Sequence, residues 1–163
     1  MYKRLIWLPA ILLMIIIFLF SSQPAEESAD LSGGISYRVV KLVSNITGKN
    51  WSDEEMLVLA AQIEHPIRKG AHLTEYALLG VSIAFGVLYG SDWYVDNRKM
   101  QCILMQLIGS LYAVSDEIHQ LFVPGRAGMI GDVMIDSIGV CIGWGIVVGL
   151  LLLGRSKFLY SNK

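Results

Sequence analysis

The stretch LIWLPAILLMIIIFLF, residues 5–20, decides the fold class, because it is an almost uninterrupted run of apolar side chains. A helix that crosses the hydrocarbon core of a bilayer needs roughly 20 such residues. The basic Lys3 and Arg4 precede the run, and a polar segment, residues 21–23, follows it. A secretory signal peptide has a loosely similar pattern, but no clean Ala-x-Ala cleavage site follows, so we expect an uncleaved span over residues 5–22.

The composition of the whole chain also indicates a membrane protein. Of its 163 residues, 54% are hydrophobic and 17% are charged, whereas a soluble domain usually has about 25% charged residues. Three further apolar segments predict spans over residues 68–90, 101–123 and 129–153. The expected fold is therefore one all-α domain over residues 1–163, a bundle of four transmembrane helices. Small residues that permit close helix approach recur in the last three spans: Gly80, Gly86, Gly109, Ser110, Gly139, Gly143 and Gly145.

Charge and cysteine usage exclude other classes of protein. The net charge is −1, and no block of Lys and Arg indicates a nucleic-acid partner. Cys102 and Cys141 lie in apolar sequence without metal-ligand spacing, so we interpret both as small hydrophobic side chains.

Basic residues near the span ends predict the orientation of the chain. Pairs of basic residues precede the first span and separate the second from the third, and more close the chain: Lys3, Arg4, Arg98, Lys99, Arg155, Lys157 and Lys163. Because basic residues flank membrane spans mainly on the cytoplasmic side, we expect both termini in the cytoplasm. Residues 23–67 then form an external segment.

This external segment carries signals for two helices. A capping box and a hydrophobic staple predict a helix start (Ser52 with Glu55, and Trp51 with Met56). We expect Pro66 to end or sharply bend that helix before the second span. A weaker helical pattern covers residues 35–46. The two helices either anchor the segment at the membrane surface or cover a site like a lid.

Polar residues enter three of the predicted spans near one end of each. They are Arg68, Lys69, His72 and Glu75 on the second span, Asp116, Glu117, His119 and Gln120 on the third, and Asp132 and Asp136 on the fourth. Consecutive spans run in opposite directions, so these ends meet at one level of one leaflet. A charged group at bilayer depth costs at least about 2.5–3.5 kcal/mol, so we expect one shared polar site. A Pro-Gly turn at residues 122–126 brings Arg126 to the same level.

Several of these residues also have structural interpretations. Arg68 and Lys69 fit anchors at the lipid headgroups, Asp132 fits a helix N-cap, and His72 fits a hydrogen-bonded packing residue. The count of charges is unequal, with five carboxylates against three fixed cations. Protonation of a carboxyl, charging of the histidines or a divalent metal would balance the two remaining negative charges, so the sequence leaves a metal cofactor open.

The motifs resemble those of the VanZ-like family of small membrane proteins. The residues that carry the resemblance are Arg68-Lys69-x-x-His72-x-x-Glu75-Tyr76, Asp116-Glu117-x-His119-Gln120-x-Phe122-x-Pro124-Gly125-Arg126, the later Asp132 and Asp136, and Ser21-Ser22-Gln23. The resemblance covers essentially the whole chain. It implies a multi-pass protein of the bacterial cell membrane and a link to low-level resistance to teicoplanin, a lipid-bearing glycopeptide antibiotic.

A site in the outer leaflet indicates a protein that acts on or binds an anionic amphiphile, either a lipid-linked cell-wall intermediate or a lipid headgroup. The expected substrate-binding residues are Arg68, Lys69, Arg126, Gln120, Asp132 and Asp136. The candidate catalytic residues are His119 and Glu117 as base and acid, His72 and Asp116 to position a water, and Glu75. A binding or shielding protein without turnover and a small proton-coupled lipid transporter are the alternatives, and oligomer formation stays open.

Overall fold

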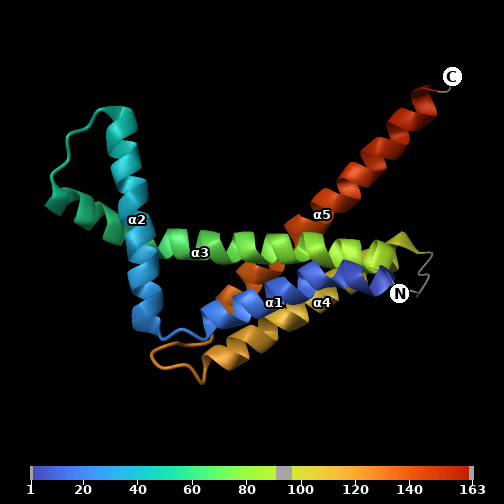
Figure 1. The fold of residues 1–163 in the computed structure, drawn as a ribbon, viewed down its shortest axis with the longest axis horizontal. Helices are drawn as coiled ribbons and strands as arrows, with labels where there is room; N and C mark the ends of the chain where they lie inside the picture. Colours follow the sequence, from blue (N-terminus) through green and yellow to red (C-terminus); the bar gives the residue numbers. More distant parts are fainter. Residues whose placement is uncertain (1, 91–96, 162–163) are drawn as a thin grey trace.

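The computed structural model describes residues 2–90 and 97–161, and every regular element in those two ranges is a helix (Figure 1). The five α-helices are α1 Leu8–Ser21, α2 Ala25–Thr47, α3 Asp53–Phe85, α4 Arg98–Gln120 and α5 Ile130–Ser161. A 3-10 helix, Tyr2–Trp7, leads into α1, and a π-helix, Gly86–Gly90, extends α3. The all-α expectation is confirmed.

Three stretches of the described chain are helical, long enough and apolar enough to cross a membrane. They are Lys3–Ser21, Asp53–Gly90 and Ile130–Gly154, which correspond to the first, second and fourth predicted spans. The third predicted span forms α4, which does not reach the same mean hydropathy. Length and composition therefore support three spans directly, and the fourth needs a separate argument.

Helix α3 is the centre of the bundle, and its most extensive contact is with α5. Figure 1 shows α1 and α4 running alongside α3, while α5 crosses α3 obliquely and extends beyond it. Glycines bring α3 and α5 together as expected. A Cβ atom at Gly139 would lie 2.6 Å from the Leu73 carbonyl oxygen, and one at Gly80 or Gly143 would clash with main-chain oxygens of the facing helix. Gly145, by contrast, faces open space.

The start of α3 follows the sequence prediction. The Ser52 hydroxyl accepts a hydrogen bond from the Glu55 N–H at 3.3 Å, and the Glu55 carboxylate accepts one from the Ser52 N–H at 2.8 Å. Pro66 was expected to end or sharply bend the helix; it lies inside α3, which continues to Phe85, so the helix does not end there. Proline removes one main-chain hydrogen bond, and α3 packs against both α2 and α5.

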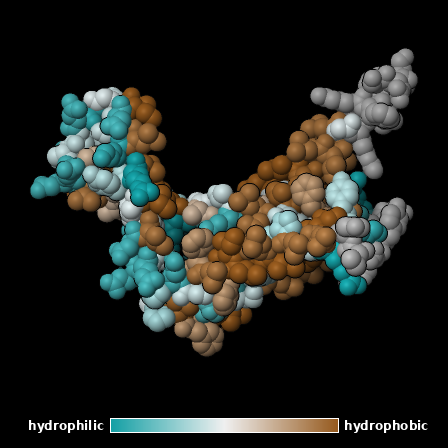
Figure 2. Space-filling model, in the orientation of Figure 1, coloured by the Kyte–Doolittle hydropathy of each residue, from teal (hydrophilic) through white to brown (hydrophobic). Residues whose placement is uncertain are grey.

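Helix α2 stands across one end of the bundle (Figure 1). Its buried side chains against α3 are small, namely Ser32, Ser36, Val40 and Ser44. Its large apolar side chains are exposed: Leu31, Ile35, Val39, Leu42, Val43 and Ile46. Figure 2 shows hydrophobic colour on the side of α2 that faces along the bundle and hydrophilic colour on the opposite side. Helix α2 is thus amphipathic with its apolar side left uncovered by the protein.

Candidate functional site

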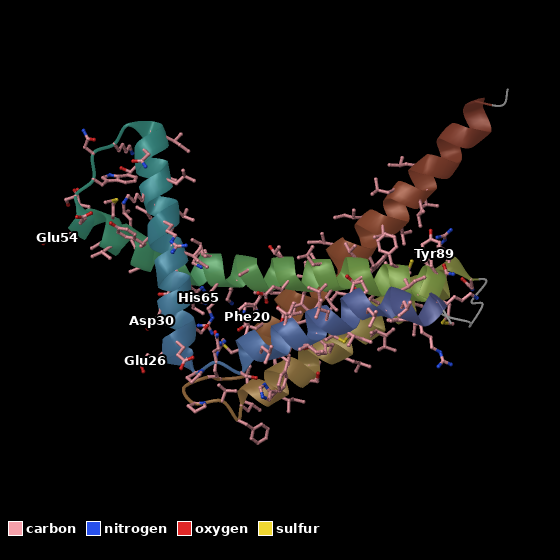
Figure 3. The ribbon with its side chains drawn as sticks, in the orientation of Figure 1. Phe20, Glu26, Asp30, Glu54, His65 and Tyr89 are labelled. Atoms are coloured by element: carbon pink, nitrogen blue, oxygen red, sulfur yellow. The ribbon has the colours of Figure 1, made fainter. Side chains whose placement is uncertain are left out.

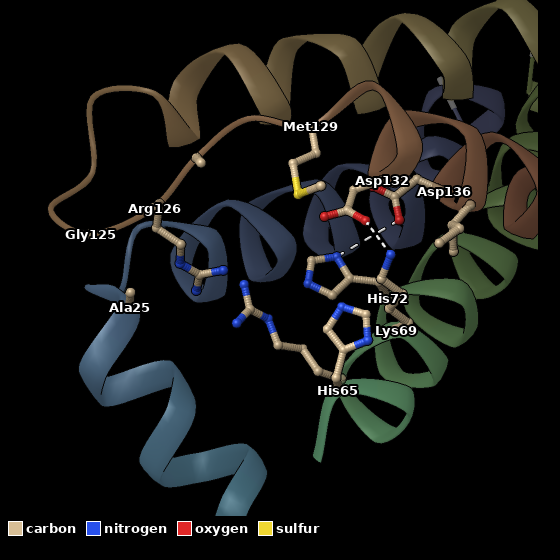
Figure 4. A pocket seen from close by; sticks show the side chains of 12 residues that line it. Ala25, His65, Lys69, His72, Gly125, Arg126, Met129, Asp132 and Asp136 are labelled. Atoms are coloured by element: carbon tan, nitrogen blue, oxygen red, sulfur yellow. Dashed lines mark ion pairs between the residues drawn. The ribbon is translucent and has the colours of Figure 1, made fainter. Parts of the chain in front are cut away.

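Polar side chains gather at the end of the bundle next to α2. Figure 3 places Phe20 and His65 at this end and Tyr89 at the other. A cavity of about 270 Å³ opens here between α3, the loop at residues 121–129 and the first turns of α5 (Figure 4). Six of the predicted site residues line it: Arg68, Lys69, His72, Arg126, Asp132 and Asp136. The expectation that separate helix ends form one polar site is met for these six.

Helices α3 and α5 face each other across the cavity through one ion pair and one longer contact between a histidine and a carboxylate (Figure 4). The Lys69 Nζ atom lies 3.2 Å from Asp132 Oδ1. The His72 Nδ1 atom lies 3.8 Å from Asp136 Oδ1, which is too long for a hydrogen bond. Asp136 is fully buried, and neither of its carboxylate oxygens accepts a hydrogen bond from the described residues. Asp136 therefore offers two unused acceptor atoms at the cavity.

Two arginines line the cavity without a carboxylate partner among the described residues. Arg126 donates instead to main-chain oxygens at the end of α1, from Nε to Gln23 at 3.1 Å and from a terminal nitrogen to Phe20 at 3.3 Å. Burial lowers the pKa of the Arg126 guanidinium, and the positive charge of Arg68 acts in the same direction. The two guanidinium groups thus form a positive region that can bind an anion.

A tight turn fixes the position of Arg126. Gly125 has a φ of 72°, in the left-handed region that glycine adopts without strain. The Pro124 carbonyl accepts a hydrogen bond of 3.1 Å from the Ala25 N–H, which joins this turn to the start of α2. The turn predicted from the sequence therefore places Arg126 between the ends of α1 and α2.

A second cavity, of about 360 Å³, adjoins the first and lies between α2, α3 and the end of α1. Arg68, His72 and Arg126 line both cavities, and Glu75 lines only the second. The rest of its wall combines the apolar Phe20, Leu31, Ile35, Ile67 and Ala71 with the neutral polar Ser21, Gln23, Ser28 and Ser32, and most of its surface is apolar. We call the first cavity the polar chamber and the second cavity the apolar chamber. The two chambers share three ionisable side chains.

Asp116 is not exposed to either cavity, because neutral donors surround its carboxylate. The Ser21 hydroxyl donates to Oδ1 at 2.6 Å, and the Tyr76 hydroxyl and the Gln120 amide donate to Oδ2 at 3.3 Å each. These bonds connect α1, α3 and α4. They indicate a positioning role for Asp116 and Gln120, which the sequence assigned to water activation and substrate binding.

Glu117 and His119 also lie outside the two cavities. The Glu117 carboxylate accepts hydrogen bonds from the Gln120 amide at 3.1 Å and from the Met129 N–H at 2.9 Å. The ring of His119 stacks against Phe18 of α1, with 4.4 Å between ring centroids. The sequence interpretation expected His119 to share one site with His72 and Asp136. His119 does not line the cavity that those two residues line.

Asp116 and Glu117 line neither cavity, so the charges of the cavities are counted without them. Without Asp116 and Glu117, the two cavities have three cations, Arg68, Lys69 and Arg126, and three carboxylates, Glu75, Asp132 and Asp136. Among the described residues, no group of three or more His, Cys, Asp or Glu side chains has the geometry to hold a metal ion.

Sequence reasoning missed the contributions of His65, Met129 and of α2 to the cavity walls. It also missed Ser21 and Tyr76 as donors to Asp116, although both belong to the quoted motifs. Their isolation as polar residues beside apolar runs is the signal that could have identified them.

No curated protein and no solved structure matches the chain. A family model described as VanZ/LLP1 matches residues 6–153, which include the four predicted spans except residue 5, and every residue of the first cavity. The chain belongs to the VanZ/LLP1 family.

Proposed function

We propose that this protein is a four-span protein of the bacterial cell membrane that binds the phosphate-bearing head of a membrane amphiphile in its polar cavity. The observation that carries the proposal is the pair Arg68 and Arg126, two cavity-lining guanidinium groups without a carboxylate partner among the described residues. Guanidinium groups bind phosphate through charge-assisted, often bidentate hydrogen bonds.

Helix α4 serves as the fourth span because its polar side chains point inward. Asp116, Glu117 and Gln120 are buried, and Gln106 accepts a 2.8 Å hydrogen bond from the Trp144 indole of α5. The exposed side of α4 carries a continuous apolar stripe: Met100, Ile103, Leu107, Leu111, Val114 and Ile118. Lipid contacts only the exposed side of a helix, so mean hydropathy underestimates how well α4 fits the bilayer.

The cavity faces the extracytoplasmic side in this proposal. The 3-10 helix Tyr2–Trp7 and the last turns of α5 lie toward the end of the bundle opposite the cavity or extend beyond it (Figure 1). The basic residues near the span ends favour a cytoplasmic location for the termini. Helix α2 then lies in the outer interface with its apolar stripe toward the lipid, which is the usual placement of an amphipathic interfacial helix.

Binding without turnover fits the carboxylates of the site better than acid–base catalysis through Asp116 and Glu117. Asp116 and Glu117 use their oxygens to accept internal hydrogen bonds. One contact favours a catalytic form of the protein, namely His72 beside Asp136 at 3.8 Å. In that form His72 would take a proton from an attacking water at the bound head.

Resistance to teicoplanin would follow from binding at this place. Lipid-linked cell-wall intermediates and the lipid tail of the antibiotic both meet the outer leaflet. A protein that holds or shields an anionic head there would reduce access of the antibiotic to its target.

The test is a lipid titration of the detergent-purified protein, followed by native mass spectrometry. A mixture of phosphatidylethanolamine and phosphatidylglycerol supplies the phosphate head, and diacylglycerol supplies the same acyl chains without a phosphate. We expect the phospholipids to bind at least about tenfold more tightly, because hydrogen bonds to charged groups contribute roughly 1.5–3 kcal/mol. We expect Arg68→Ala to remove most of that difference.

Arg38→Ala is the matched control, because Arg38 is an exposed cation of α2 that lines neither cavity. Equal binding of phospholipid and diacylglycerol by the wild-type protein would overturn the proposal. So would an Arg68→Ala protein that binds phospholipid as tightly as the Arg38→Ala protein.

A further inference from the structure

The two cavities contain equal numbers of fixed cations and carboxylates, and this equality bears on which charges a ligand should carry. Lys69 and Asp132 pair with each other at 3.2 Å. Arg68 and Arg126 then remain as cations, and Glu75 and Asp136 remain as carboxylates. A purely anionic head would satisfy the two arginines and leave both carboxylates without a partner.

Asp136 needs a hydrogen-bond donor that the described residues do not supply. Its side chain is fully buried at the cavity, and no described residue donates to either oxygen. His72 comes no closer than 3.8 Å. A buried carboxylate without donors is strongly destabilised, so a ligand group with N–H donors and a positive charge would bind favourably at Asp136.

The apolar chamber indicates that the ligand also has hydrocarbon chains. Its wall is formed by Leu31 and Ile35 of α2, by residues of α3 and by Phe20. Arg68, His72 and Arg126 line both chambers, so a head bound in the polar chamber leads directly into the apolar one. A free, water-soluble head group would leave this surface uncovered.

We propose that the ligand is a zwitterionic phospholipid whose head joins a phosphodiester to a primary ammonium. The phosphodiester contacts Arg68 and Arg126, the ammonium donates to Asp136, and an acyl chain lies in the apolar chamber beneath α2. This inference rests on the proposed function and identifies the lipid class bound at the same site.

The test compares lipids of matched chain length by competition in native mass spectrometry. Phosphatidylethanolamine has both charges and three N–H donors, phosphatidylcholine has both charges and no N–H, and phosphatidylglycerol has the phosphate alone. We expect the wild-type protein to bind phosphatidylethanolamine at least about tenfold more tightly than either other lipid, as expected for one charged hydrogen-bonded contact. Glycerophosphoethanolamine, the soluble head, should compete only at more than about a hundredfold higher concentration.

Asp136→Asn tests the assignment of the ammonium, because it keeps the shape of the side chain and removes its charge. We expect the preference for phosphatidylethanolamine over phosphatidylglycerol to fall below about twofold. Asp30→Asn, at an exposed position of α2, should keep the full preference. The wild-type competition requires no variant, so it decides the proposal even if Asp136→Asn does not fold.

The outcomes separate this inference from the proposed function. Equal binding of the three phospholipids by the wild-type protein, all tighter than diacylglycerol, would overturn the zwitterion and leave phosphate binding intact. Efficient competition by the soluble head would overturn the acyl-chain assignment. Phospholipid binding no tighter than that of diacylglycerol would overturn the proposed function itself.

Discussion

The Ser21 hydroxyl donates a 2.6 Å hydrogen bond to Asp116 Oδ1 and so joins the end of α1 to α4 across 95 positions of sequence. Tyr76 of α3 donates to the other oxygen of the same carboxylate. One buried charged group therefore holds three helices in register behind the cavity. This arrangement assigns Asp116 to the framework of the site.

The first prediction concerns this framework. We expect Ser21→Ala to lower the free energy of unfolding by about 1–3 kcal/mol, because Asp116 loses its shortest hydrogen bond in a buried place. Thermal unfolding in a fixed detergent measures the effect. Ser22→Ala is the control, because among the described residues the Ser22 hydroxyl donates to the Phe18 carbonyl in the adjoining turn of α1 and not to another helix. Equal stability of the two variants would contradict the assignment.

The second prediction concerns the contact between α3 and α5. A Cβ atom at Gly143 would clash with main-chain atoms of Ala77 and Val81, whereas one at Gly145 would meet nothing within 4 Å. We expect Gly143→Ala to destabilise the protein by about 1–3 kcal/mol, as overpacking typically does. Gly145→Ala should leave the unfolding temperature unchanged or slightly raised. A Gly143→Ala protein as stable as the Gly145→Ala protein would show that the helices do not approach closely here.

The third prediction links the turn after α4 to ligand binding. Gly125→Ala places a Cβ atom in a left-handed conformation that costs about 1–2 kcal/mol, and at 3.0 Å from the Ala25 side chain. We expect Arg126 to be displaced and phospholipid affinity to fall by about tenfold. Gly131→Ala, where a Cβ meets open space, is the control for the titration. Unchanged phospholipid affinity in Gly125→Ala would show that the conformation of this turn does not affect binding at the site.

The fourth prediction tests whether α4 crosses the membrane. With four spans both termini lie on the same side, and with three spans they lie on opposite sides. We expect alkaline phosphatase to be inactive and green fluorescent protein to be fluorescent when either is fused to the N- or the C-terminus. Phosphatase inserted after Gly48, between α2 and α3, should be active. An active phosphatase at the C-terminus would show that α4 does not cross the membrane.

The fifth prediction concerns antibiotic sensitivity. Expression of the wild-type protein in a teicoplanin-sensitive bacterium should raise the minimum inhibitory concentration, and Arg68→Ala should abolish the increase because it removes an unpaired cation of the cavity. Arg38→Ala, expressed at the same level in the membrane, should retain it. No difference between cells with and without the wild-type protein would reject the link to resistance.

Most of the fold was predictable because it depends on local properties of the chain. The apolar run at residues 5–20 and the capping box at Ser52 define where helices form without reference to distant residues. The local sequence around Pro66 predicted an end or a sharp bend of the helix, but α3 continues through it and packs against both α2 and α5. Helix α2 gave a weak signal, because the small side chains that it buries against α3 include three serines, which dilute its hydrophobic pattern.

The amino-acid sequence alone determined that this is a helical membrane protein of one family and that its ionisable residues lie near one end of the spans. Only the tertiary structure decided which of those residues share a cavity. Asp116 and Asp136 look alike in sequence, each a carboxylate inside an apolar segment. Neutral donors from three helices surround the first, whereas no described residue donates to the second. The physical reason is that hydrogen-bond partners come from segments far apart along the chain, and helical periodicity specifies a face of one helix but not the side chains that it meets.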